Sequence, residues 1–472
     1  MPLALPPTIG KSMVDELSID PWGSSQSTDY SRIIDQFGLQ SMQDVDVPNP
    51  SRLHRRDVIF AHRDLDLVLD AKRNGNSFGV LTGLMPSGNM HLGHSMVIDQ
   101  VKWFQELGGD VTIAVADLES SATRGVSLAK GREVALSEYV SYYAALGLDP
   151  EKTNVYFQST RSIVQRMGFQ LGKRTNISEF EAIYGFDGST NLAHVQAPLV
   201  QAGDILHPQL DEFGGLRPIV VPVGVDQDPH LRLTRGLAAK TNWFNVNSAK
   251  NGGLLIGLSM QEENAAALGQ LPNGRVDRDR QKEVFAKIVN AVSALGYSDI
   301  ISNPKHGTVH LPGATLGDRG KVRMVLLALE REMGGQGLLA PSSTYHRFAV
   351  GMTGDKMSSS KPKTTIFLGD EISAVEKKIK RSFSGGQATV EEHRRLGGNP
   401  DIDVAYQYMM YFFEEDDSYL GEINSGYRSG SILAGEMKQL CIERATDWLS
   451  NLQEMRDQTA HLVNDFLAPD AL

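Results

Sequence analysis

The sequence has little of what would place a protein in an oxidising compartment or a membrane. Its 472 residues include one cysteine, Cys441, which excludes an intrachain disulfide framework and a cysteine-based metal cluster. No apolar run approaches the roughly 18 residues of a spanning helix. The first ten residues have prolines but no basic stretch before an apolar core, unlike a signal peptide. We therefore expect a cytoplasmic protein with no membrane segment, in which Cys441 is a small buried apolar residue.

The sequence also lacks an excess of positive charge and a phosphate-binding P-loop. Its net charge of -11 disfavours a generic nucleic-acid binder, so any RNA contact must use local basic patches. No G-x-x-x-x-G-K-[ST] sequence occurs, so P-loop nucleotide hydrolysis has no support. With 41% hydrophobic residues over this length, the chain should form two or three globular domains.

Strand-like and helix-like patterns alternate after residue 76. Short apolar runs at 77–83, 111–116, 154–157 and 217–225 predict buried parallel strands. Between the first two, residues 91–107 have helical spacing and end at a glycine pair. This order predicts an α/β fold with a doubly wound, Rossmann-like parallel sheet, whose ligands bind at the carboxyl ends of the strands.

The other segments predict three further units. Residues 1–75 are expected to be an N-terminal extension, and 76–369 the Rossmann-like domain. Around 250–340 the strand–helix alternation is lost and helical patches remain, which indicates an insertion. Residues 370–472 are helical in pattern with glycine-rich breaks, and we expect an all-helical C-terminal domain there.

The first candidate site is the loop Pro86-Ser87-Gly88 and the helix start that follows it. His91 and His94 lie three residues apart, on one face of that helix. Free amides and the positive end of the helix dipole favour a phosphate there, and two imidazole donors can stabilise charge on a reacting phosphorus. Gly88 and Gly93 would allow a nucleotide to approach the backbone closely.

Two other interpretations of the histidine pair stay open. One histidine could cap the helix while the other makes a structural hydrogen bond. The pair could also supply two ligands to zinc, although the sequence offers no persuasive set to complete a tetrahedral site. The preceding strand and the Pro-Ser-Gly loop favour the phosphate interpretation.

The second candidate site is a polar loop at residues 354–362. Lys356 can neutralise the β- and γ-phosphates of a nucleotide. The hydroxyls that follow Met357, on Ser358, Ser359 and Ser360, can donate hydrogen bonds to the same phosphates. The alternative is an ordinary solvated loop of serines and lysines.

Together the two segments resemble a known family. His91-Leu92-Gly93-His94 and Lys356-Met357-Ser358-Ser359-Ser360 resemble the HIGH and KMSKS motifs of class I aminoacyl-tRNA synthetases. Residues 225–235 resemble the D-Q-D-P-x-x-R-x-T-R stretch of the tryptophanyl group of archaeal and eukaryotic type, and the glycine-rich breaks after residue 383 resemble its helical domain. The chain departs from the pattern at Ser359, where the motif has a second lysine, and at Leu81, where eukaryotic relatives tend to carry tyrosine.

The resemblance implies a reaction and its participants. L-Tryptophan and ATP, with Mg²⁺, would give tryptophanyl-adenylate and pyrophosphate, and the tryptophanyl group would pass to tRNA(Trp). The helical domain would read the anticodon, and the protein would be a homodimer. Basic residues near the domain junction would hold tRNA phosphates: Lys361, Lys363, Lys377, Lys378, Lys380, Arg381, Arg394 and Arg395.

The resemblance also implies roles for individual residues. His91, His94 and Lys356 would be catalytic, and no residue is expected to bind a metal. ATP would be bound by Pro86, Ser87, Gly88, Gly93, Met357, Ser358, Ser359 and Ser360. The amino acid would be bound by Glu119, Gln201, Asp204, Asp226 and Gln227.

Asp204 has the most specific expected role. It would accept the indole N–H, a buried polar demand that rejects phenylalanine; the alternative is a carboxylate that caps its own helical turn. Gln201 projects from the same helical face, whereas Asp226 and Gln227 would hold the substrate ammonium or the ribose. A tyrosyl enzyme stays open, since Gln201 and Asp204 also suit a phenol hydroxyl, as does a non-catalytic synthetase-like protein that binds RNA or nucleotide.

Overall fold

A seven-stranded sheet organises the centre of the molecule. The computed structural model describes residues 30–261, 263–270 and 275–471. The sheet has the order β1-β2-β11-β6-β3-β4-β5. Its strands are β1 (Gln40–Ser41), β2 (Ile59–Arg63), β3 (Gly79–Leu84), β4 (Asp110–Val115), β5 (Thr153–Phe157), β6 (Ile219–Gly224) and β11 (Ser342–His346). The five strands from β11 to β5 are parallel, and β1 and β2 add an antiparallel edge.

This sheet confirms the predicted α/β fold and its four predicted strands. It also shows that residues 40–63, expected in a separate N-terminal extension, contribute two strands to the central sheet. The expected boundary at residue 75 therefore falls inside the sheet domain. Residues 1–29 of that extension lie outside the described residues.

Apolar side chains that alternate along the strands bury both faces of the sheet. Val80 and Val220 face α3 (Leu65–Arg73) and α4 (Leu92–Glu106) in one core cluster. Leu81 and Val221 point the other way, into a cluster with residues of α10 (Leu192–Leu206) and α11 (Asp228–Thr241). Helices on both faces make this a doubly wound sheet.

Further helices complete this part of the molecule. They are α1 (Tyr30–Phe37), α2 (Arg52–Arg55), α5 (Asp117–Arg124), α6 (Leu128–Val134), α7 (Ser141–Ala145), α8 (Ser162–Leu171) and α9 (Ile177–Tyr184).

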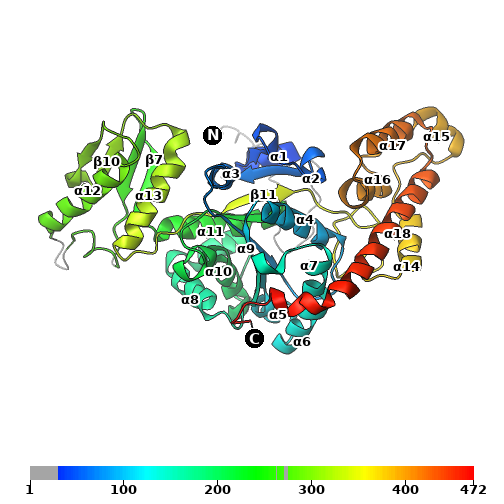
Figure 1. Cartoon of the computed structure of the whole chain (residues 1–472), viewed down its shortest axis with the longest axis horizontal. Helices are drawn as coiled ribbons and strands as arrows, with labels where there is room; N and C mark the ends of the chain where they lie inside the picture. Colours follow the sequence, from blue (N-terminus) through cyan, green and yellow to red (C-terminus); the bar gives the residue numbers. More distant parts are fainter. Residues whose placement is uncertain (1–29, 262, 271–274, 472) are drawn as a thin grey trace, which may run out of the picture.

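The insertion after α11 contains a sheet of its own, which the sequence did not predict. Four antiparallel strands pair in the order β7 (Phe244–Ser248), β8 (Leu254–Leu258), β10 (Thr308–Leu311) and β9 (Ile301–Asn303). The two helical patches expected there are present as α12 (Arg278–Ser293) and α13 (Arg319–Glu332), which pack on this sheet around a separate core. Figure 1 shows the unit on the left, away from the helical domain.

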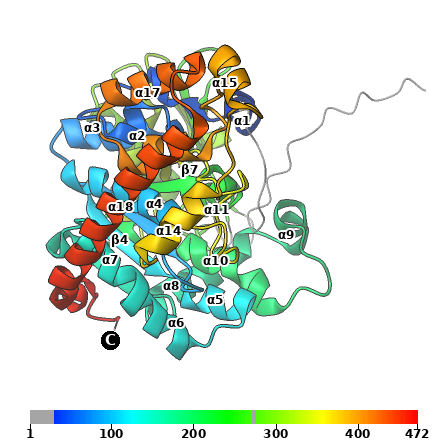
Figure 2. The same cartoon turned by 90° about the vertical axis from the view of Figure 1, so that its right-hand side faces the viewer.

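The C-terminal part is helical, as predicted. It contains α14 (Ile372–Lys380), α15 (Val390–Leu396), α16 (Val404–Tyr408), α17 (Asp417–Ser429) and α18 (Ala434–Thr459). Cys441 is buried in α18. Figure 2 shows α18 running down the side of the molecule from this domain to the sheet domain, where it packs on α7. None of the helices in the described part of the chain combines the length and apolarity needed to cross a bilayer.

Candidate active site

Backbone hydrogen bonds hold the two motif segments together at the carboxyl end of β3. Leu92 N donates to Ile366 O at 3.2 Å, and Leu368 N donates to Met90 O at 2.9 Å. A bridge between His91 and Phe367 lies between these bonds. The start of α4 is thereby fixed to the chain that follows the Lys356 loop.

The loops themselves also come into contact. A Cβ placed on Gly88 would lie 3.5 Å from Ser359 Cβ, so the Pro-Ser-Gly loop approaches the serine run. Ser358 Oγ and Ser360 Oγ share a hydrogen bond of 2.9 Å. Met357 is buried beneath them, as Pro86 is in the other loop, while Ser87 is exposed. Apart from Gly93, which lies in the first turn of α4, the residues expected to bind ATP thus come from two loops that face each other.

His91 and His94 form a stacked pair at the start of α4. Their ring centroids are 3.7 Å apart, with 21° between the planes. His91 N donates to His94 Nδ1 at 3.1 Å, so His94 caps the helix and keeps its Nε2 as the ring donor. Nδ1 of His91 is buried without a hydrogen-bond partner. A Cβ on Gly93 would lie 3.0 Å from the His91 ring, so glycine there makes room for this imidazole.

Both histidines are neutral at physiological pH. Burial lowers the pKa of His94 to about 4. Burial, with help from His94 and Lys356, lowers the pKa of His91 well below its ordinary value. The pair can therefore donate hydrogen bonds through neutral N–H groups, and the full positive charge at this site belongs to Lys356.

Lys356 is held by Asp226, at the carboxyl end of β6. The distance from Lys356 Nζ to Asp226 Oδ2 is 2.7 Å, and the ammonium also lies 4.9 Å from the centroid of the Phe348 ring. A Cβ on Gly224 would lie 2.6 Å from Asp226 Oδ1, so glycine at this position lets the carboxylate take up its place. Asp226, expected to hold the substrate ammonium or the ribose, pairs with this lysine in the structure.

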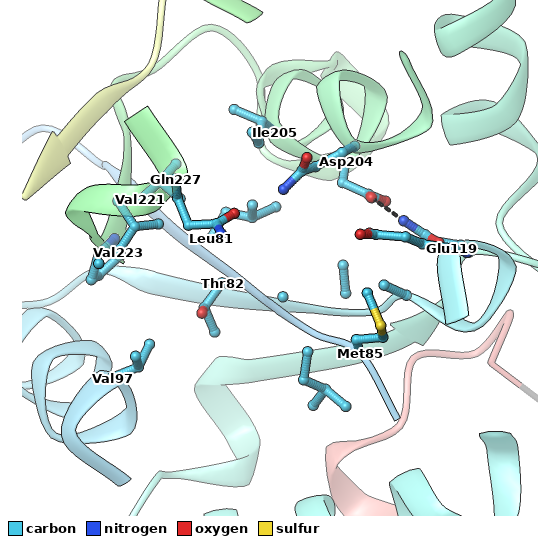
Figure 3. Close-up of a pocket in the computed structure, with 18 of the residues that line it drawn as sticks. Leu81, Thr82, Met85, Val97, Glu119, Asp204, Ile205, Val221, Val223 and Gln227 are labelled. Carbon is cyan, nitrogen blue, oxygen red and sulfur yellow. Dashed lines mark hydrogen bonds between the residues drawn. The ribbon is translucent and has the colours of Figure 1, made fainter. Parts of the chain in front are cut away.

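A cavity of about 310 Å³ opens at the carboxyl ends of β3, β4 and β6. This volume is at the lower end of the roughly 300–1,000 Å³ typical of small-ligand sites. Apolar walls come from Leu81, Met85, Val97, Ile205, Val221 and Val223 (Figure 3). Glu119 and Asp204 point toward one end of the cavity, and Gln227 lies at the other. Gln201 also lines it.

Asp204 is buried and firmly held. Its Oδ1 accepts a hydrogen bond from Tyr156 Oη at 2.5 Å, and its Oδ2 accepts one from Gln158 Nε2 at 2.6 Å. Burial raises the pKa of Asp204 to about 7, although these hydrogen bonds and nearby Arg161 oppose the shift. A carboxylate has about four acceptor positions, so an ionised Asp204 keeps two for a ligand.

Glu119 is the second carboxyl group of the cavity. Burial and the neighbouring Asp204 raise its pKa to about 7, while Arg124 opposes the shift. Two acidic groups with raised pKa values beside one cavity are typical of a ligand site. They also hold fewer than two negative charges between them at neutral pH.

Sequence reasoning missed the residues that position Asp204. Tyr156 and Gln158 lie on and just after β5, which carries no local motif. Their side chains come near α10 only through the packing of the sheet, so no sequence pattern could have found them.

Some residues of the motif at 225–235 have structural roles. Buried Asp228 accepts hydrogen bonds from Arg63 and Tyr345, and Arg235 forms an ion pair with Asp64.

Comparison with known proteins identifies the family to which the chain is similar. The family model for tRNA synthetases class I (W and Y) matches residues 73–256 and 325–450. The tryptophan–tRNA ligase of Methanosarcina acetivorans is 39% identical over 96% of this chain and 98% of its own. That of Thermoplasma acidophilum is 39% identical over 95% and 99%.

A solved structure has the same architecture. Tryptophanyl-tRNA synthetase from Aeropyrum pernix superposes with a TM-score of 0.70, at 33% identity, over 95% of this chain and 99% of its own. The two motif segments, the nearby cavity at the carboxyl ends of the strands and these relatives all indicate the same family. The chain belongs to the class I tRNA synthetases of the tryptophanyl and tyrosyl group, and within it to the tryptophan–tRNA ligase family.

Proposed function

We propose that this protein activates L-tryptophan with ATP and transfers it to tRNA(Trp). A carboxylate oxygen of tryptophan attacks the α-phosphorus, the bond to the β-phosphate oxygen breaks, and pyrophosphate leaves with the bonding electrons. The terminal ribose hydroxyl of the tRNA then attacks the carbonyl carbon of the adenylate. AMP leaves, and the hydroxyl proton is released.

The observation that carries this proposal is the apolar cavity that ends at a buried, pre-oriented Asp204. The indole ring suits the apolar walls, and its one N–H donor requires a buried acceptor. Tyr156 and Gln158 leave acceptor positions free on Asp204. Phenylalanine would leave that acceptor unpaired, at a cost of about 1–3 kcal/mol. Gln201, Gln227 and Glu119 are the groups proposed to hold the α-ammonium.

The phosphate chemistry is assigned to the two facing loops. Neutral His91 and His94 would donate N–H groups to the phosphates, and Lys356 would stabilise negative charge on the departing pyrophosphate. Its ammonium is paired with Asp226 at 2.7 Å in this structure, and we propose that it turns from Asp226 to the phosphate during the reaction. Freed Asp226 would then accept from the ribose. The protein supplies positioning and charge and forms no covalent intermediate.

Mg²⁺ is assigned to the substrate rather than to an all-protein site. The described residues contain no group of three His, Cys, Asp or Glu side chains placed to hold a metal ion. Mg²⁺ usually keeps several waters and binds substrate phosphates with few carboxylates. It would therefore enter with the triphosphate of ATP and help to neutralise it.

We assign catalysis to the sheet domain, at residues 76–369 with β1 and β2 added at its edge and the insertion at about 250–340, and tRNA binding to residues 370–472. Support comes from exposed basic side chains on and after α14 and α15, at Lys377, Lys380, Arg381 and Arg395. Two other basic residues expected to meet tRNA are used within the fold. Lys378 pairs with Asp370, and Arg394 donates to the carbonyls of Gly430 and Ser431. We also propose that the protein carries out this reaction in the cytoplasm.

We also propose a homodimer. Three large apolar side chains are exposed on consecutive helices: Phe169 at 81% on α8, Ile177 at 58% on α9 and Leu192 at 78% on α10. Large exposed apolar side chains that gather on one surface are typical of a site of association, and we propose that these three do so. Phe169→Asp should convert a dimer to a monomer in sedimentation velocity, while Phe383→Asp, at an exposed site in the helical domain, should not. A monomeric wild-type protein would contradict the assignment.

Pyrophosphate exchange tests the proposed function. The purified protein should incorporate labelled pyrophosphate into ATP when tryptophan is present and show little exchange with tyrosine or phenylalanine. Exchange with tyrosine alone would make it a tyrosyl enzyme. No exchange with any amino acid would support a non-catalytic synthetase-like protein.

A further inference from the structure

The C-terminal end of the chain returns to the sheet domain. Figure 1 shows the red segment after α18 running back beneath the sheet, where the C-terminus lies. Leu467 makes a parallel bridge to Val155 of β5, and Ala468 N donates to Val155 O at 2.8 Å. Phe466, Ala468 and Ala471 are buried in the main core. This segment, residues 466–471, is called the C-terminal tail below, and it extends the sheet at the edge nearest Tyr156.

The tail is fixed to the sheet domain by an ion pair. Both carboxylate oxygens of Asp470 accept from Arg161, from Nε at 2.8 Å and from Nη2 at 2.6 Å. The Arg161 side chain is 4% exposed and that of Asp470 is 40% exposed. A bidentate carboxylate fixes the plane of a guanidinium as well as its position, and the buried Arg161 would lose its countercharge without the tail.

Arg161 reaches Asp204 by two routes. Its guanidinium carbon lies 3.9 Å from the centroid of the Tyr156 ring, and Tyr156 Oη donates to the Asp204 carboxylate. Its Nη1 also lies 3.2 Å from His207 Nε2, while His207 Nδ1 lies 2.8 Å from the backbone oxygen of Asp204. Because Arg161 can only donate, His207 accepts at Nε2 and donates from Nδ1. One route ends at the side chain of Asp204 and the other at its backbone.

We propose that the C-terminal tail, through Asp470 and Arg161, positions Tyr156 and Asp204 and thereby sets the affinity of the cavity for the amino acid. This inference rests on the proposed function, since Asp204 is taken as the indole acceptor. Asp470 and Arg161 are positioning residues and do not touch the substrate. Because the tail follows directly on the helical domain, it also links that domain to the amino-acid cavity.

Substitution of Asp470 tests the proposal. Asp470→Asn keeps the size of the side chain, removes its charge, and should raise KM for tryptophan in pyrophosphate exchange by about tenfold. At saturating tryptophan, kcat should stay within about twofold, because binding is weakened and the reacting phosphates are untouched. Asp470→Glu restores the charge and should bring KM back toward the wild-type value.

Arg456→Gln is the matched control. Arg456 also joins α18 to the sheet domain, through Ser137 O, Ser141 Oγ and Tyr142 Oη, but it lies outside the contacts that lead to Asp204. It should leave KM for tryptophan unchanged. Calorimetric titration with tryptophan in the absence of ATP should rank the dissociation constants of the variants in the same order as their KM values. Thermal melting should show that each variant is folded.

The outcomes separate this inference from the proposed function. A wild-type protein without tryptophan-dependent exchange overturns the proposed function, and the inference with it. If the wild type is active, an unchanged KM in both Asp470→Asn and Arg161→Lys overturns the inference alone. An equal rise of KM in Arg456→Gln also overturns it, since the effect would then come from general loosening of the helical domain.

Discussion

Replacement of Lys356 by alanine separates a transition-state role from a structural one. In the resting protein the lysine side chain is 25% exposed and its partner Asp226 is 10% exposed, at a separation of 2.7 Å. Loss of the ammonium leaves a mostly buried carboxylate without its cation. The cost to folding should be about 1–3 kcal/mol, since Asp226 keeps the amide of Gln227 as a donor at 3.3 Å.

The expected kinetic effect is larger. One oriented donor removed from a site of developing charge typically costs about 10²–10³ in rate, or about 2.7–4 kcal/mol. Ser359 occupies the place of the second lysine of the motif, so the neighbouring position cannot substitute for the lost charge. Lys356 lies outside the lining of the amino-acid cavity, so tryptophan affinity should change by less than about twofold.

Two measurements on Lys356→Ala test whether the lysine acts in the transition state. Rapid quench of a single turnover gives the rate of adenylate formation, and calorimetry without ATP gives the dissociation constant for tryptophan. Lys361→Ala is the control: this lysine belongs to the same loop, but it is 48% exposed and lies 3.7 Å from Asp355. It should slow the step by no more than about threefold. Equal losses of rate and of tryptophan affinity in Lys356→Ala would refute the assigned role.

Three further predictions follow from the cavity and the fold. Asp204→Asn should raise KM for tryptophan by about 10- to 100-fold in pyrophosphate exchange, the cost of a mispaired buried acceptor. The pKa of Asp204 is raised to about 7, so KM of the wild type for tryptophan should fall as the pH rises through 7 and ionises this acceptor. In Asp204→Asn this pH dependence should weaken to the part that is due to Glu119. A pH profile of KM that is the same in the variant and the wild type would contradict the role of Asp204. Gly93→Ala should lower kcat about tenfold with little change in KM for tryptophan, because the new methyl group displaces the His91 ring, and full activity would show that the ring position is unimportant. Asp403→Ala should lower the free energy of unfolding by about 2–4 kcal/mol in denaturant titrations. The reason is that buried Asp403 accepts hydrogen bonds from two backbone N–H groups and a tyrosine hydroxyl. Asp401→Ala, at an exposed site, is the control and should lower it by less than about 1 kcal/mol.

The parts of the fold that could be predicted from sequence are those with strong local signals. Strand β3, its turn and α4 follow directly on one another, and their apolar spacing predicted them within a few residues. The polar strand β11 gave no such signal, because Ser342, Thr344 and His346 are buried in it. The four-stranded sheet of the insertion was missed for a related reason: its strands are short, and β8 contains Gly257, whose missing side chain makes room for Asn245.

In the candidate site, too, the sequence predicts the residues of continuous motifs but not the contacts between distant residues. The loops that carry His91 and Lys356 could be recognised as segments, since each has its residues in a row. The contacts of Asp204 with Tyr156 and Gln158, and of Arg161 with Asp470, join residues 46 to 309 positions apart. Such pairs have no signature in the order of the residues, because they arise only when strands and a tail pack against a helix.

Charging of tRNA tests the central claim most directly. With ATP and Mg²⁺, the purified protein should attach labelled tryptophan to a tRNA(Trp) transcript in an acid-precipitation assay. It should leave tRNA(Tyr) uncharged and should not attach tyrosine to either tRNA. Charging with tyrosine, or no charging by a protein that catalyses pyrophosphate exchange with tryptophan, would contradict the account.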